Sequence, residues 1–126
     1  MNDEISEDID TKIVLAYMKY LAEDRLRKGA PGMLIALNSL AMKMYGVYVT
    51  ELLVRNPKGF VDVLNMYFRN QDTTQRFVRY LLKPLAEAGG EDGRRAIEAL
   101  INGDKAEFIT YSVKVLRDKA KKWFKS

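Results

Sequence analysis

The sequence predicts an all-α protein, a compact bundle of five to six helices around a buried central helix. Apolar residues recur along most of the chain at the three- and four-residue spacing of amphipathic helices. No segment alternates apolar and polar residues as a half-buried strand does, and no internal repeat is present. At 126 residues, 48% of them hydrophobic, the chain suits a single core. We expect one helical domain over residues 11–126, preceded by an acidic, flexible tail over residues 1–10.

Helix boundaries follow from residues that start or stop helices. Asp and Asn precede several apolar periodic segments, and Gly or Pro follows them. Pro84 lies inside the fourth expected helix and should kink or divide it, because proline lacks the backbone donor. The expected N-caps are Asp8 or Asp10, Asn56 ahead of Pro57, Asp72 and Asp104. The expected helices cover residues 11–28, 33–54, 57–69, 72–88, 92–100 and 104–125.

The second expected helix, residues 33–54, is the candidate for the buried centre. It contains only two charged residues, Lys43 and Glu51, and a helix that is apolar nearly all round is normally buried. Its 22 residues could also span a bilayer, but the polar interruptions and the lack of a basic flank favour a core helix. Gly46 inside it costs about 1 kcal/mol relative to Ala, which the close approach of another helix would explain.

The residue types exclude most catalytic chemistry. The chain has no cysteine and no histidine, so it lacks disulfides, thiolate metal ligands and the usual general base. Asp104, Lys105 and Glu107 resemble a nuclease cluster, but a capping box accounts for the two acids. The glycine-rich segments lack the Gly-Lys-Ser/Thr ending of a phosphate-binding loop. We therefore expect no enzymatic activity, no metal and no cofactor.

Charge is distributed unevenly along the chain. Residues 1–10 contain five acids and no base, whereas residues 11–126 hold 21 bases and 12 acids, a net charge of +9. A basic body attracts phosphate polymers, and the acidic tail should weaken that attraction. The tail lacks the basic and apolar regions of a signal peptide, so we expect a cytoplasmic protein. Abundant charges of both signs and few glutamines are typical of thermophilic, including archaeal, proteins.

Two helices carry basic faces opposite their apolar positions. In the fourth helix Arg76, Arg79 and Lys83 share one face, and in the last helix four bases do so. Such faces contact phosphates, and nearby aromatic rings stack on bases, which favours RNA or single-stranded DNA as the partner. An acidic protein partner or a merely solvated surface is the alternative. The bases of the last helix are Lys114, Arg117, Lys121 and Lys125, and the stacking candidates are Tyr80 and Tyr111. The core-facing positions expected opposite them are Phe77, Leu81, Leu85, Ile109, Val113, Leu116, Ala120 and Trp123.

The C-terminal part of the chain also resembles a known family. Residues 80–90 (YLLKPLAEAGG), a short helix and then residues 108–125 are similar to the small helical subunit of type III CRISPR effector complexes. The resemblance covers residues 76–126 and lacks the aromatic-histidine ending of some members. It implies a subunit without catalytic activity that lines up along a guide–target duplex in antiviral defence. Lys83, Arg94, Arg95 and the bases of the last helix would be its contacts.

These observations favour one function and leave two alternatives. We expect a non-enzymatic, nucleic-acid-binding structural subunit of a larger complex, which contacts phosphates through basic helix faces and needs no membrane. The first alternative is a viral or archaeal DNA-packaging or nucleocapsid-type protein. The second is a protein–protein adaptor with a basic docking surface.

Overall fold

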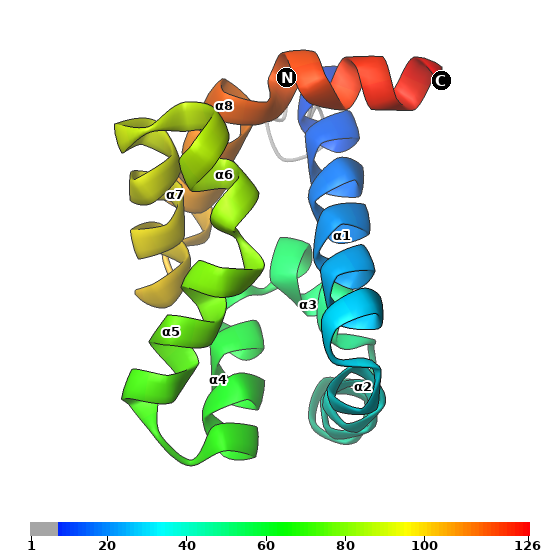
Figure 1. The fold of residues 1–126 in the computed structure, drawn as a ribbon, viewed down its shortest axis with the longest axis vertical. Helices are drawn as coiled ribbons and strands as arrows, with labels where there is room; N and C mark the ends of the chain where they lie inside the picture. Colours follow the sequence, from blue (N-terminus) through cyan, green and yellow to red (C-terminus); the bar gives the residue numbers. More distant parts are fainter. Residues whose placement is uncertain (1–7) are drawn as a thin grey trace, which may run out of the picture.

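The computed structural model describes residues 8–126, and these form eight helices with no strand among them (Figure 1). The all-α class is therefore confirmed, but the expected five to six helices are too few. Two of the expected helices are each divided into two. The helices are α1 (Ile9–Gly29), α2 (Pro31–Tyr45), α3 (Val49–Arg55), α4 (Pro57–Phe68), α5 (Gln71–Leu81), α6 (Lys83–Gly89), α7 (Glu91–Ile101) and α8 (Lys105–Lys125).

The expected helix over residues 33–54 is divided at Gly46. This residue has φ 76° and ψ 12°, the left-handed conformation that favours glycine, and its N–H bonds to the Met42 carbonyl at 3.0 Å. The axes of α2 and α3 differ by 58° across the break. Nothing lies within 4 Å of the place where a Cβ on Gly46 would stand. Gly46 thus ends a helix, and the expectation that another helix packs closely against it is wrong.

The buried central helix is α3, not the longer α2. Five of the seven residues of α3 are buried, and it lies between α1 and the α4–α5 pair in the middle of the molecule (Figure 1). Helix α2 lies at the lower end and buries only Leu34, Leu37 and Ala41. Its Ile35 is 72% exposed and its Met42 46% exposed. A scarcity of charge in the sequence does not mean burial here, because α2 turns an apolar face to solvent.

The second division occurs between α5 and α6, next to Pro84. Leu82 has φ −103° and ψ 20°, and Pro84 stands in the first turn of α6, which confirms the effect expected of this proline. The start of α5 differs from the expectation. Asn70, not Asp72, is the N-cap, and its side chain accepts a hydrogen bond from the Thr73 N–H at 3.0 Å. Asp72 lies inside the first turn of the helix.

The other expected N-caps are present. The side chain of Asp8 accepts from the Thr11 N–H at 2.7 Å, and Asn56 and Asp104 make the equivalent bonds at 3.0 and 3.1 Å. Because Asp8 caps α1, residues 8–10 belong to the folded body, and the tail expected over residues 1–10 is shorter than that range. Its remainder, residues 1–7, lies outside the described residues, as does the expectation that it is flexible.

Helix α8 crosses the upper end of the molecule and packs on both α1 and α7 (Figure 1). Its expected core positions are right for Leu116 and Ala120 but not for Ile109, Val113 and Trp123, which are half-buried. On α5 and α6, Leu81 and Leu85 are buried as expected, while Phe77 is half-buried. The buried stripe of α8 is Phe108, Ser112, Leu116 and Ala120. The buried residues of α5 are Thr74, Val78 and Leu81.

The close packing of α6 on α7 depends on Gly93, and this gives a first prediction. A Cβ at this position would overlap the backbone carbonyl of Leu85, which cannot move aside as a flexible side chain would. We expect Gly93→Ala to destabilise the protein by about 2–3 kcal/mol, as overpacking does in other cores. Gly32→Ala is the matched control in a helix, since nothing lies within 4 Å of the new methyl group. It should be neutral or stabilise by up to about 1 kcal/mol. Urea unfolding of both variants measures the difference, and equal stabilities would contradict the packing described.

Candidate nucleic-acid interface

Three of the predicted cations come from three different helices and meet at one surface hollow. Arg79 lies on α5, Lys83 at the start of α6 and Arg94 on α7, and the hollow has a volume of about 200 Å³. Its floor is apolar, formed by Ala86 and Ile97. We call this site the basic hollow; its lining residues are Arg79, Lys83, Ala86, Arg94, Ile97 and Glu98.

Local backbone features bring these side chains together. The break at Leu82 starts a new helix at Lys83, so this residue is displaced from the face that Arg79 occupies on α5. The absence of a side chain on Gly93 lets the first turn of α7 lie against the Leu85 backbone of α6. Arg94, the next residue, consequently emerges beside α6. The grouping therefore depends on one proline and one glycine and not on helical spacing alone.

The charges of the basic hollow are only partly compensated. Arg79 pairs with Glu98 at 2.5 Å, and Lys83 lies 3.8 Å from Glu87. Arg94 has no ion-pair partner within residues 8–126. The paired side chains are 48–65% exposed, and such surface pairs contribute at most about 1 kcal/mol each. A phosphate could replace either carboxylate at little energetic cost.

Arg76 and Arg95 lie outside the basic hollow. Arg76 is one turn before Arg79 on the same face of α5, 82% exposed and 3.6 Å from Asp72. Arg95 points to a different hollow of about 320 Å³, whose lining includes Glu98, Asp104 and Glu107. Its guanidinium pairs with Glu91 at 2.9 Å and donates to the Tyr111 hydroxyl at 3.2 Å. The acidic surroundings of Arg95 disfavour an anion there.

The four bases of α8 form a second basic surface, the α8 ridge: Lys114, Arg117, Lys121 and Lys125. They lie on the side of α8 opposite its buried stripe, as expected from their spacing. Acids of other elements approach the ridge: Asp92 lies 3.5 Å from Lys114, and Asp10 lies 3.3 Å from Lys121. The Thr11 N–H, and to a smaller extent the charge of Arg117, hold the pKa of Asp8 below its usual value. The scarcity of acids within α8 itself therefore overstates how free its bases are.

At least six of the nine predicted cations are paired with carboxylates in the described part of the chain. Each of these pairs has an N–O distance between 2.5 and 3.8 Å, and none of the six cations is more than partly buried. The basic faces are thus already adapted to bind carboxylates. The six are Arg76, Arg79, Lys83, Arg95, Lys114 and Lys121.

Each of the two stacking candidates already has an arginine over its ring. The guanidinium carbon of Arg25 lies 4.6 Å from the ring centroid of Tyr80, and that of Arg95 lies 5.8 Å from the centroid of Tyr111. Arg25 also donates to the Tyr80 backbone carbonyl at 2.9 Å. A base could stack only on the opposite ring face, and Tyr80, at 47% exposure, is the better placed of the two.

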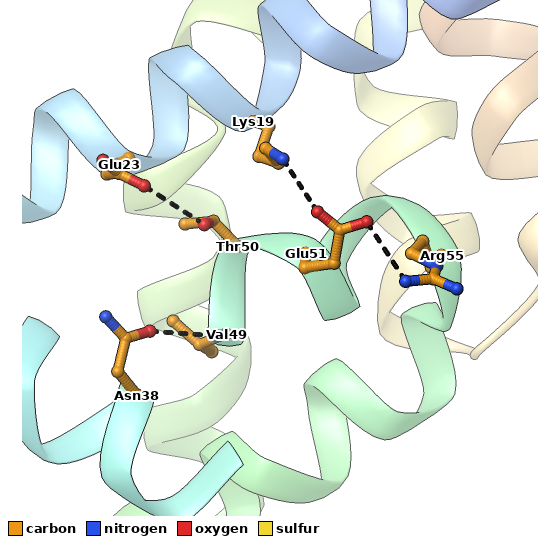
Figure 2. A network of polar contacts seen from close by, with 7 residues as sticks. All are labelled: Lys19, Glu23, Asn38, Val49, Thr50, Glu51 and Arg55. Carbon is orange, nitrogen blue, oxygen red and sulfur yellow. Dashed lines mark hydrogen bonds and ion pairs between the residues drawn. The ribbon is translucent and has the colours of Figure 1, made fainter. Parts of the chain in front are cut away.

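A polar network between α1, α2 and α3 is not anticipated by the sequence patterns (Figure 2). Glu51 lies at its centre, 2.7 Å from the Lys19 amine and 3.5 Å from the Arg55 guanidinium. Asn38 accepts from the Val49 N–H at 2.9 Å and so holds the start of α3. In the sequence, Asn38 and Glu51 stand out only as interruptions of an apolar helix. The informative signal is that Glu51 is the only acid between residues 33 and 54.

This network lines a hollow of about 490 Å³ with balanced charge. Lys19 and Arg55 face Glu23 and Glu51 across it, and Thr50 donates to Glu23 at 3.4 Å. The hydrogen bond from Lys19 lowers the pKa of Glu51, although partial burial of the carboxylate acts in the opposite direction. Two cations matched by two acids give no net attraction for a phosphate, so the network is a structural link and the basic hollow remains the candidate interface.

Other types of site find no support in the described residues. Across residues 8–126, no cluster of three or more Asp or Glu side chains is arranged to hold a metal ion. No single helix of that range has the length and hydropathy needed to cross a membrane; α2 and α3 together do, but they are bent by 58°. Comparisons of the sequence and structure with protein-family models, curated proteins and solved structures gave no match.

The Glu51 network gives a second prediction, on stability and pH. Glu51→Gln should lower the free energy of unfolding by about 1 kcal/mol at pH 7, because it removes two partly exposed ion pairs. The folded-state pKa of Glu51 lies below its usual value of 4.5, so this stabilisation is present above that pH. It is lost as the pH falls through the folded-state pKa. Unfolding of wild type and variant at pH 7 and pH 3 tests this, with the exposed Glu87→Gln as control. A difference that persists at pH 3 would show another cause.

Proposed function

We propose that the chain is a non-enzymatic, nucleic-acid-binding structural subunit of a larger assembly. It would contact the phosphate backbone through the basic hollow and the α8 ridge. The observation that supports this most is the meeting of Arg79, Lys83 and Arg94 around one hollow, three bases against the single lining acid Glu98. Arginine guanidinium groups and a lysine ammonium are the usual ligands of backbone phosphates.

The chemistry of the hollow favours backbone contact over base recognition. Its floor consists of Ala86 and Ile97, which can pack against a sugar but cannot read the edge of a base. Exposed pairs such as Arg79–Glu98 exchange a carboxylate for a phosphate without burying a charge. Binding should therefore depend strongly on salt and weakly on sequence. RNA or single-stranded DNA is favoured, because the open face of Tyr80 could add stacking.

The resemblance to the small subunit of type III CRISPR effector complexes is consistent with this proposal. The basic hollow and the α8 ridge both lie within residues 76–126, the segment that carries the resemblance. A role beside other protein subunits in antiviral defence would follow. Arg95, which the resemblance suggests as a contact, lies among acids and is the weakest of the proposed contacts.

An adaptor for an acidic protein is the second candidate, and the ion pairs favour it. At least six predicted contacts already bind carboxylates of the chain itself, so carboxylates of a partner could take their places. The two proposals differ in the ligand that competes. Single-stranded RNA should displace a phosphate-directed probe from the protein, whereas an adaptor surface should prefer an acidic polypeptide.

The third prediction tests the basic hollow. Replacing Arg79, Lys83 and Arg94 together with Gln should weaken binding of single-stranded RNA at least about tenfold at low salt. The slope of log affinity against log salt should flatten by about 0.7 for each phosphate that the protein no longer neutralises. Fluorescence anisotropy with a labelled oligonucleotide measures both. The side chains are exposed, so circular dichroism and stability should not change.

A control variant with the same change of net charge separates site from charge. Lys28, Lys58 and Lys105 are exposed and lie outside both proposed surfaces, and their joint replacement by Gln also removes three positive charges. This control should retain most of the affinity and the salt slope. Equal decreases in both triple variants, or no binding of RNA or DNA by the wild type at low salt, would refute the proposed interface.

The fourth prediction concerns the acids of residues 1–7. Deleting this segment removes Asp3, Glu4 and Glu7 but keeps the Asp8 cap of α1. We expect affinity for single strands to rise by up to about tenfold at low salt, and hardly at all at high salt, because the effect is a long-range repulsion. Replacing the three acids by Asn and Gln keeps the length and should act like the deletion. If only the deletion alters binding, the segment acts by something other than charge.

A further inference from the structure

The outward face of α2 is apolar and has no partner among the described residues. Ile35 and Met42 on this face are 72% and 46% exposed, more than a soluble helix usually leaves in water. The residues between and beside them are small. The only charged residue of α2 is Lys43, at the edge of the face. We call this face the α2 stripe; it consists of Gly32, Ile35, Ser39, Met42 and Gly46, at helical spacings of three, four, three and four.

Gly32 has no explanation inside the chain. Its φ is not positive, unlike that of Gly46, and nothing lies within 4 Å of the place where its Cβ would stand. A glycine in a helix is nevertheless less favourable than alanine by up to about 1 kcal/mol. Small residues on an outward helix face allow a second backbone to approach closely. Gly32 and Ser39 together thus indicate a contact from outside the described chain.

The stripe is symmetric about Ser39. Glycines stand seven residues before and after it, and the large apolar side chains Ile35 and Met42 stand four before and three after. We propose that α2 pairs antiparallel with α2 of a second copy of the chain, around a two-fold axis that passes near Ser39. Ile35 of each copy would then pack beside Met42 of the other, and the glycines at the two ends would let the backbones close on each other. A two-fold interface requires such a self-complementary face.

A second copy fits this face better than any charged partner. The stripe itself carries no charge, so neither a phosphate backbone nor an acidic peptide finds a ligand on it, apart from Lys43 at the edge. In the antiparallel arrangement the two Lys43 residues would lie about 12 Å apart along the helices, roughly a Debye length at ordinary salt. The pairing therefore buries apolar groups without bringing like charges together. It does not depend on the proposed nucleic-acid function.

Cross-linking can test the geometry directly, because the chain has no cysteine. Ser39→Cys places one thiol next to the proposed axis, so mild oxidation should yield a disulfide-linked dimer. Gly32→Cys is the matched control on the same face. In the antiparallel pair its two thiols would lie about 21 Å apart along the helices and should not join. If Gly32→Cys cross-links as fast as Ser39→Cys, or if neither does, the proposed arrangement is wrong.

The oligomeric state provides the second measurement. One pair of helices of this length forms a small interface, so sedimentation should be followed from about 1 µM to 1 mM protein. We expect a monomer–dimer equilibrium that Ile35→Glu shifts at least about tenfold towards monomer. Ile9→Glu is the control, since Ile9 on α1 is 71% exposed, almost the same as Ile35. A monomer throughout this range, or a dimer that tolerates Ile35→Glu while circular dichroism shows both variants folded, would refute the proposal.

Discussion

The packing of α8 on both α1 and α7 is the contact on which the rest of the structure depends. The two helices are far apart in sequence, and α8 joins them across the upper end of the molecule (Figure 1). Its buried stripe alternates large and small residues, Phe108, Ser112, Leu116 and Ala120, which lets neighbouring helices approach. Because this stripe faces inwards, the four bases opposite it must face solvent. The location of the α8 ridge is therefore a consequence of the core.

The basic hollow has a comparable origin in backbone constraints. Pro84 forces a new helix to begin after α5, and Gly93 permits α7 to lie on the backbone of α6. Three bases from separate helices then surround an apolar floor. Bulk at position 93 would move α7 away from α6 and open the hollow. Stability and the proposed function thus depend on the same glycine, although no glycine contacts the proposed ligand.

Local signals in the sequence predict the caps at Asp8, Asn56 and Asp104 and the break at Pro84, because each acts within one helical turn. The role of Gly46 is ambiguous in the sequence, because glycine is compatible with both a tight helix contact and a left-handed helix end. Ion pairs such as Lys121–Asp10 cannot be foreseen, since they join residues distant in sequence. Helical spacing identifies the proposed contacts, but their grouping and their partial neutralisation are visible only in the tertiary structure.

The positions of the two proposed surfaces have a consequence for binding. The α2 stripe lies at the lower end of the molecule and the α8 ridge at the upper end (Figure 1). A dimer joined through α2 would therefore carry its α8 ridges away from the shared interface, and both could engage phosphates at once. The second contact would then be intramolecular, so a weak site would gain affinity on a long strand but not on a short one. The absence of charge from the α2 stripe and its concentration on α8 are consistent with this division of roles between self-association and phosphate binding.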